Sequence, residues 1–413
     1  MNTFTILFLF LLGMALAVEL WLANRHIRHI AANRDHVPEA FQANIALPEH
    51  QKAADYTIAH TRFGRIEDVY GTLLLVLWTV GGGLEWLDRG LRDFGWSDLA
   101  TGAVFMLGVF LIMGLLELPM SLYQTFVIEN SFGFNKTTPG LFITDLVKKT
   151  ILLTVLGAPL VLAALWLMQE TGPLWWVYVW LLWSGFTLFL VWAYPSLIAP
   201  IFNKFTPLRE GGVRARIQSL LERTGFRTRG IFVMDGSRRS NHGNAYFTGF
   251  GKTKRIVFFD TLLNHLGEKE IEAVLAHELG HFKRHHVLKR MLFTFGFSLI
   301  GLAVLGWLVE QTWFYSGLGV STPSTHAALT LFMLAGPVFT FFLQPLLAWS
   351  SRRYEYEADS FAAEQTDAGE LVSALVKLYK ENASTLTPDP LHSAFYDSHP
   401  PAALRIAHLT GKT

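Results

Sequence analysis

The sequence predicts an all-α multi-pass membrane protein with seven transmembrane helices and a small α+β domain inserted between them. Hydrophobic residues make up 51% of the 413 residues and charged residues only 16%, whereas a typical soluble domain carries about 25% charged residues. Lys and Arg also alternate between rich and poor loops. Seven apolar stretches are long enough to cross about 30 Å of hydrocarbon as helices, over residues 3–22, 66–86, 101–121, 150–168, 174–194, 287–309 and 326–350.

The first apolar stretch could be mistaken for a signal peptide. No Lys or Arg precedes it, and no small-residue cleavage site leads into a secreted-type domain. Both features are expected of a secretory signal. We therefore interpret it as a retained membrane helix.

The Lys and Arg residues indicate the orientation of the spans. Six lie between the first two spans, whereas residues 169–173 and 310–325 contain none. Because these residues favour cytoplasmic loops, we expect the N-terminus outside and the C-terminus in the cytoplasm. The long loop 195–286 then shares the cytoplasmic side with the C-terminal segment.

The long loop has the pattern of a small α+β insertion. Residues 213–223 are amphipathic, 230–235 and 255–260 are short apolar runs between turn residues, and helical periodicity resumes at Glu268. The sequence thus divides into four parts: membrane helices 1–5 with their loops, the cytoplasmic insertion, membrane helices 6–7, and a C-terminal cytoplasmic segment, with bounds 1–194, 195–286, 287–350 and 351–413.

Composition also excludes some partners and sites. The net charge is +1 and there is no cysteine. A near-neutral chain without basic runs gives no indication of a nucleic-acid partner. Disulfides and cysteine-liganded metal sites are impossible without cysteine.

The sequence HELGH, residues 277–281, lies within the helical pattern that follows Glu268. Two imidazoles four residues apart share a helix face about 6 Å apart along the axis, so His277 and His281 can occupy two corners of a zinc tetrahedron. Glu278 would lie beside the metal and accept a proton from a water that the metal polarises. The alternative is a solvated helix with coincidental histidines.

A catalytic zinc site needs a third protein ligand, and the chain offers Glu355. Asp359 is four residues further on and shares its helix face, so one carboxylate can bind metal while the other orients a ligating imidazole. Glu357 is expected to point elsewhere. An ordinary solvated acidic stretch after the last span remains the alternative. We interpret His285 and His286, which follow HELGH directly, as interfacial cations or helix-surface groups.

Five stretches resemble the type I CAAX prenyl endopeptidases, integral-membrane zinc proteases of the gluzincin kind. The resemblance runs from about residue 60 to 408, and the stretches are Leu118–Glu129 with Gly133–Lys136, Ser240–Phe247, HELGH, Glu355–Asp359 and Ser398–Pro401. It implies a small zincin-like catalytic domain with one Zn²⁺ per chain.

The resemblance also implies roles for individual residues. Glu355 would be the third zinc ligand and Asp359 its supporting carboxylate. Asn244 and Ala245 match the edge strand that pairs with an extended substrate. His399 would stabilise the oxyanion, and Arg405 would assist. The ordinary alternatives are a turn residue at Asn244, a helix-entry turn at His399 and a surface charge at Arg405.

Three functions compete. The first is an endopeptidase that releases the C-terminal tripeptide after a prenylated cysteine. The second is general quality control of membrane proteins by the same chemistry without a prenyl requirement, and the third is a non-catalytic membrane chaperone or scaffold. The partners are a peptide, possibly prenylated, and the lipid bilayer. The site would lie on the cytoplasmic side of a bacterial inner membrane or an ER membrane.

Overall fold

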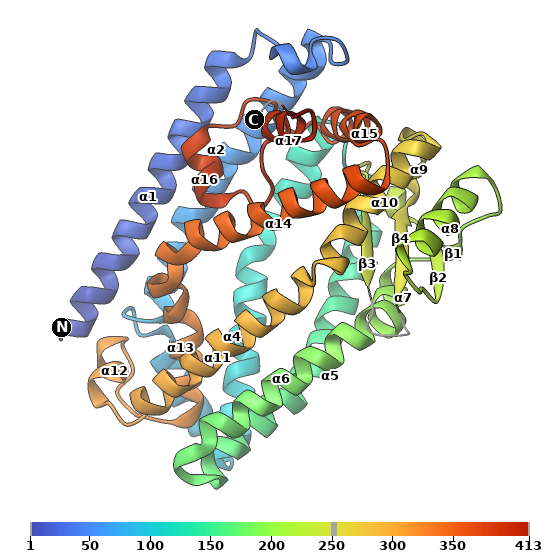
Figure 1. Cartoon of the computed structure of the whole chain (residues 1–413). Coiled ribbons are helices and arrows are strands. Elements are labelled where there is room, and N and C mark those ends of the chain that lie inside the picture. Colours follow the sequence, from blue (N-terminus) through green and yellow to red (C-terminus); the bar gives the residue numbers. More distant parts are fainter. Residues whose placement is uncertain (1, 249–253, 412–413) are drawn as a thin grey trace.

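The computed structural model describes residues 2–248 and 254–411 (Figure 1). It is mostly helical, with one small sheet. The helices are α1 Thr3–Asn33, α2 Leu47–Trp78, α3 Gly83–Arg92, α4 Asp98–Tyr123, α5 Pro139–Glu170, α6 Trp175–Ala193, α7 Ala199–Phe202, α8 Gly212–Thr224, α9 Asp260–His265, α10 Glu268–Lys283, α11 His286–Leu308, α12 Thr312–Gly317, α13 Thr325–Thr340, α14 Gln344–Gln365, α15 Ala368–Glu381, α16 Pro390–Tyr396 and α17 Ala402–Leu409.

Long apolar helices account for the predicted membrane spans. Within the described residues, six helical segments are long and apolar enough to cross a membrane, and a seventh is counted when α2 and α3 are taken as one bent span. Each of the seven predicted stretches overlaps one of these segments. The chain is therefore an integral multi-pass membrane protein.

The second predicted span is not one continuous helix. The sequence predicts a helix through residues 66–86, but α2 ends at Trp78 and α3 continues at a bend of 45°. Three glycines fill the break. Gly82 has φ +80°, and a Cβ on Gly81 would lie 2.8 Å from the backbone of Leu77. Only glycine fits this close turn without strain.

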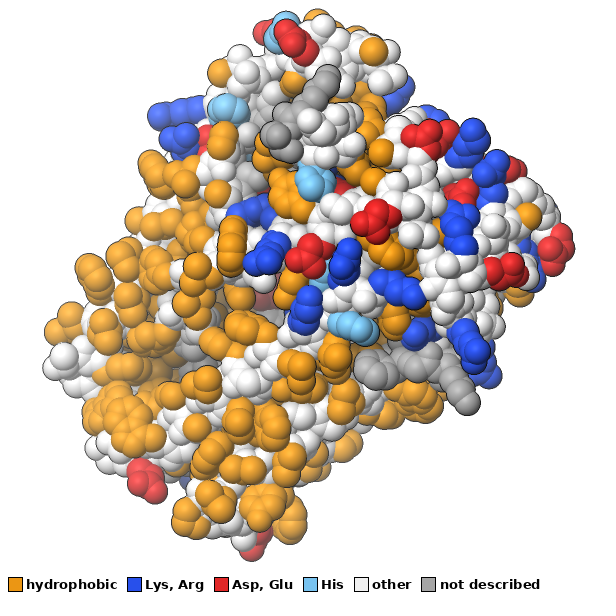
Figure 2. Space-filling view, in the orientation of Figure 1, with side chains coloured by type: hydrophobic (Ala, Val, Ile, Leu, Met, Phe, Trp, Pro, Cys, Tyr) orange, Lys and Arg blue, Asp and Glu red, His pale blue; other side chains and the backbone are white. Residues whose placement is uncertain are grey.

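The surface of the bundle matches a lipid environment. On α11, Leu292 and Ile300 are 62% and 65% exposed, which would be costly over a whole helix face in water. Figure 2 shows hydrophobic side chains spread over the lower left of the molecule, whereas Lys, Arg, Asp and Glu gather at the upper right. The apolar part thus lies along the spans and the charged part over the inserted domain.

The sheet has four strands in the order β1-β2-β4-β3: β1 Phe205–Pro207, β2 Gly230–Met234, β3 Ala245–Thr248 and β4 Arg255–Phe259. β4 pairs in parallel with β2 and antiparallel with β3. Ile256, Val257 and Phe258 of β4 are buried, as expected of a central strand. β3 is left at the edge of the sheet.

Two separate hydrophobic cores hold the molecule together. One joins the membrane helices, with Phe105, Leu165 and Leu331 fully buried in it. The other joins α8, the sheet, α10 and α15, around Ile217, Phe258 and Leu279. Figure 1 shows α10 beside α14, with α15 and α17 at the same end of the molecule as the sheet. The residues on α10 therefore face segments far away in sequence.

Candidate metal centre and peptide site

Helix α10 is a buried helix that carries the HELGH sequence. Ile271, Leu275 and Leu279 are almost fully buried on it. Glu270 accepts a hydrogen bond of 2.7 Å from the Gly267 N–H before the first turn, and it also accepts from Lys377 of α15 at 2.8 Å. A carboxylate at this end satisfies a free backbone donor and suits the helix dipole. The orientation of α10 is therefore fixed from both its sides and its start.

Gly280 sets the separation between α10 and α14. A Cβ at this position would lie 2.9 Å from the Ala358 Cα and 3.0 Å from the Ala358 carbonyl oxygen, and Ala358 itself is fully buried. The two backbones can approach this closely only because both residues are small. This contact brings HELGH within reach of Glu355.

Gly280→Ala is expected to destabilise the protein although alanine favours helices. The helix-propensity gain is at most about 1 kcal/mol, whereas overpacking a close backbone contact costs about 1–3 kcal/mol. Zinc retention should fall with it, because α10 and α14 would be pushed apart. Thermal unfolding and metal content measure both effects. The control is Gly296→Ala on α11, which has open space around it; equal behaviour of the two variants would contradict this role for Gly280.

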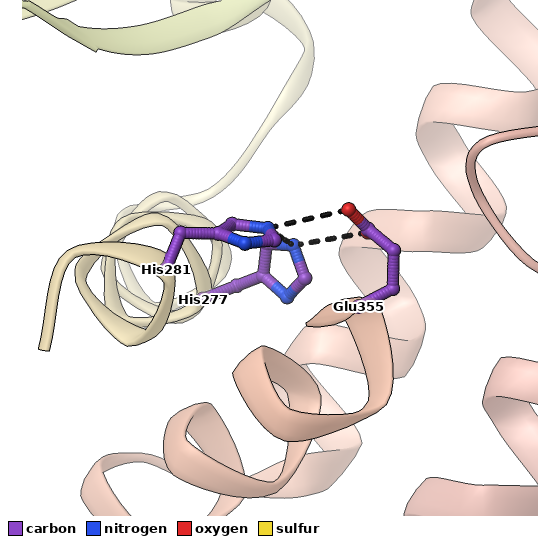
Figure 3. A group of neighbouring side chains, drawn as sticks. All are labelled: His277, His281 and Glu355. Atoms are coloured by element: carbon purple, nitrogen blue, oxygen red, sulfur yellow. Dashed lines mark hydrogen bonds and ion pairs between the residues drawn. The ribbon is translucent and has the colours of Figure 1, made fainter. Parts of the chain in front are cut away.

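Three side chains from two helices meet at one point. Figure 3 shows His277 and His281 of α10 pointing at Glu355 of α14. Glu355 oxygens lie 3.4 Å from His277 Nε2 and 3.3 Å from His281 Nε2, and the two Nε2 atoms are 3.2 Å apart. The structure thus brings together the three residues that the sequence singled out as a ligand set.

The spacing of these atoms fits a zinc ion. Ligand bonds of about 2.0–2.1 Å in a tetrahedron place neighbouring donors about 3.3 Å apart, which matches the three separations. Glu355 is 4% exposed, and its Oε2 atom is buried without a hydrogen-bond partner among the described residues. An unpaired buried carboxylate oxygen is costly unless a cation neutralises it. The donor set of two imidazoles and one carboxylate is one that zinc prefers in catalytic sites.

Asp359 and Arg405 lie behind His277. Asp359 is fully buried and accepts from His277 Nδ1 at 2.8 Å. The Arg405 guanidinium, also buried, donates to both Asp359 oxygens at 2.8 and 2.5 Å. Burial lowers the pKa of His277, but the hydrogen bonds to Asp359 and Glu355 outweigh it and raise the pKa to about 9. Arg405 is thus placed to hold Asp359 rather than to contact a peptide.

Glu278 and His399 flank the three-residue cluster. Glu278 follows His277 on α10, is partly exposed, and forms no hydrogen bond or ion pair with other described residues. His399 precedes α17, and its Nε2 lies 3.4 Å from Glu355 Oε1 with 65% of the side chain exposed. Both groups are therefore free to contact a ligand that approaches the cluster.

Asn244 and Ala245 lie at the start of the edge strand. Ala245 pairs with Phe258 of β4, and the Asn244 carbonyl accepts from the Phe259 N–H at 2.9 Å. These bonds use one side of β3 and leave its other side without a strand partner among the described residues. Such an edge can add an extended peptide by main-chain hydrogen bonds.

The loop before β3 is held by a carboxylate that the sequence did not single out for this role. Glu129, at the end of the π-helical turn that extends α4, accepts from the Tyr56 hydroxyl at 2.7 Å and from His60 at 2.8 Å. It also lies 3.5 Å from His242 Nε2. Sequence motifs mark both stretches, but only the fold reveals that they meet. The membrane helices thus brace the start of the candidate peptide-binding strand.

The expectations for His286 and Glu357 were wrong. His286 is 2% exposed rather than a surface group, and Glu357 points at it, with 3.0 Å between Glu357 Oε2 and His286 Nε2. The reason is the turn between α10 and α11, which directs His286 back toward His281 instead of outward. His285, in contrast, is exposed as expected.

Comparison with known proteins supports the geometry. A profile described as CAAX prenyl protease N-terminal, five membrane helices, matches residues 26–204, and peptidase family M48 matches residues 207–413. Among curated relatives, CAAX prenyl protease 1 homologues from Oryza sativa and Homo sapiens are 34% and 32% identical to this chain. The alignments cover 92% and 95% of the chain and 92% of each relative.

A solved structure shares the whole architecture. The crystal structure of S. mikatae Ste24p superposes with a TM-score of 0.90 at 28% identity, covering 99% of both chains. Peptidases of family M48 are in general zinc-dependent. The chain belongs to the CAAX prenyl protease group of peptidase family M48 and is an integral-membrane metalloendopeptidase.

Proposed function

We propose that this chain is a zinc-dependent CAAX-type endopeptidase that releases the C-terminal tripeptide after a prenylated cysteine. The observation that carries the proposal is the convergence of His277, His281 and Glu355, whose ligand atoms all lie within 4.8 Å of one another. The names of the relatives, CAAX prenyl protease 1 homologues, support the substrate class.

In this proposal, His277, His281 and Glu355 hold one Zn²⁺. A bound zinc ion would supply Lewis-acid polarisation and a lowered pKa for water. Glu278 accepts the proton of the attacking water and then delivers it to the leaving nitrogen. His399, exposed beside Glu355, donates a hydrogen bond to the oxyanion as it develops. Asp359 keeps the proton on His277 Nδ1, so that Nε2 is free to bind metal.

The peptide binds along the free side of β3. Its backbone adds a strand to the sheet beside Asn244 and Ala245, which places the scissile bond between the sheet and α10. The short sheet supplies no deep side-chain pocket at this edge, and main-chain bonds then provide much of the positioning. The bracing of the preceding loop by Glu129 keeps this strand in register with the metal ligands.

We place this site on the cytoplasmic side of a bacterial inner membrane or an ER membrane. The support is the distribution of Lys and Arg, which are abundant in residues 195–286 and absent from 169–173 and 310–325. The inserted domain and α15–α17 lie at one end of the bundle (Figure 1), as this orientation requires.

A comparison of two peptides tests the substrate class. The protein is purified in detergent and given a CAAX peptide with a farnesylated cysteine and the same peptide with a free cysteine. We expect release of the intact tripeptide, with kcat/KM at least about tenfold higher for the farnesylated peptide. That factor is about 1.4 kcal/mol, modest beside the roughly 0.8 kcal/mol gained per buried CH₂ group.

The other outcomes identify the competing functions. Equal or better cleavage of the free-cysteine peptide would reject the prenyl requirement and favour general quality control of membrane proteins. Cleavage of neither peptide by folded, zinc-loaded protein would favour a non-catalytic scaffold. Product analysis by mass spectrometry distinguishes tripeptide release from cleavage elsewhere in the peptide.

A further inference from the structure

The turn after HELGH has an unusual backbone that controls where His286 lies. Helix α10 ends at Lys283, and α11 begins at His286. Between them, His285 adopts a left-handed conformation with φ 58° and ψ 30°. Non-glycine residues rarely adopt this conformation, although histidine does so more readily than most. The turn redirects the chain so sharply that His286 folds back toward the preceding helix.

His286 forms a continuous chain of contacts with a candidate zinc ligand. Its Nδ1 lies 3.0 Å from His281 Nδ1, and its Nε2 lies 3.0 Å from Glu357 Oε2. The ring stacks on Tyr354 with centroids 4.3 Å apart and planes at 13°. With only 2% of the residue exposed, these partners define the ring orientation.

Metal binding would fix the position of every proton in this chain. If His281 binds through Nε2, its Nδ1 must carry the hydrogen. That N–H can bond to His286 only if His286 Nδ1 is the acceptor, so the hydrogen of His286 is on Nε2. The Nε2–H then donates to the Glu357 carboxylate. All three groups are paired in this single arrangement.

The two imidazole ligands are therefore supported in different ways. His277 donates directly to Asp359 at 2.8 Å, whereas His281 reaches its carboxylate through a second imidazole. We propose that His286 and Glu357 are positioning residues that hold His281 in the orientation and tautomer required for zinc. This inference rests on the proposed zinc site.

Zinc dissociation tests the inference without reference to peptide cleavage. The zinc-loaded protein is mixed with an excess of a coloured chelator, and the release rate is followed. His286→Phe retains a ring that can stack on Tyr354 but removes the acceptor. We expect release to accelerate about 10–100-fold, the effect typical of groups that support a metal ligand. The visible spectrum of the Co²⁺-substituted protein should change as well, because the ligand geometry changes.

Two further variants separate positioning from packing. In His286→Asn, the amide oxygen occupies the place of Nδ1 and can still accept from His281, so part of the slow release should return. Glu357→Ala removes only the terminal carboxylate, and Glu357 is one-third exposed, so folding should tolerate the change. We expect faster release from it too. The control is His285→Asn, which keeps a residue that tolerates the left-handed turn.

The proposal is overturned if both His286→Phe and Glu357→Ala release zinc at the wild-type rate. It is also overturned if His286→Asn is as fast as His286→Phe, because the acceptor then does not matter. A wild-type protein that binds no zinc would instead reject the proposed function itself. Thermal midpoints of the zinc-free proteins show whether faster release merely follows a loss of stability.

Discussion

Glu355→Gln is expected to purify with little or no zinc. The substitution keeps the shape of the side chain but replaces a charged ligand with a neutral amide in a site where Glu355 is 4% exposed. We expect zinc affinity to fall by at least about 100-fold, beyond the 10–100-fold typical of groups that only support a ligand. Metal analysis of the dialysed protein should give about one zinc per wild-type chain.

Glu364→Gln is the matched control for this variant. Glu364 is on the same helix, α14, but it is exposed. Its zinc content should equal that of wild type. Full zinc occupancy in Glu355→Gln, with normal occupancy in the control, would remove Glu355 from the ligand set.

Glu278→Gln is expected to keep its zinc and lose its peptidase activity. Glu278 lies beside the cluster rather than in it, so the amide leaves the three candidate ligands untouched. A positioned general base typically contributes a factor of about 10²–10⁴, and we expect kcat/KM to fall by that much. Hydrolysis of the farnesylated CAAX peptide, measured with metal content on the same samples, provides the test.

The control for Glu278 is Glu268→Gln at the start of the same helix. Glu268 is half exposed and lies 3.6 Å from Arg216, far from the cluster in sequence. This variant should keep both zinc and activity. Turnover by Glu278→Gln within a few-fold of wild type would show that another group takes the proton.

The spans were predictable because membrane helices have a local signature. A run of apolar residues long enough to cross the bilayer is visible without knowledge of its neighbours. The break between α2 and α3 was missed because an apolar average does not register backbone conformation. The Gly81–Gly83 run was the available signal: Gly82 has φ +80°, and Gly81 has no room for a Cβ.

The candidate ligands were identifiable for a similar reason. HELGH depends on helical spacing alone, and the interval from Glu355 to Asp359 does too. Their meeting across 74 residues, from His281 to Glu355, was an inference from chemistry and from the family resemblance rather than from pattern.

Contacts that depend on tertiary structure were not accessible from the sequence. The bond from Arg405 to Asp359 joins residues 46 apart, and the Glu129 cluster joins residues at least 69 apart. His286 was misjudged because a histidine after a helix, before an apolar span, usually lies at the membrane surface. The left-handed conformation of His285 reverses that expectation, and no local pattern announces it.

X-ray absorption at the zinc edge of the purified wild-type protein tests the central claim most directly. We expect about one zinc per chain, with nitrogen and oxygen ligands at about 2.0–2.2 Å and scattering from two imidazoles. Glu355→Gln, reloaded with zinc, should keep both imidazoles and lose the carboxylate. A spectrum with one or three imidazoles, or a wild-type protein that holds no zinc, would contradict a centre built from His277, His281 and Glu355.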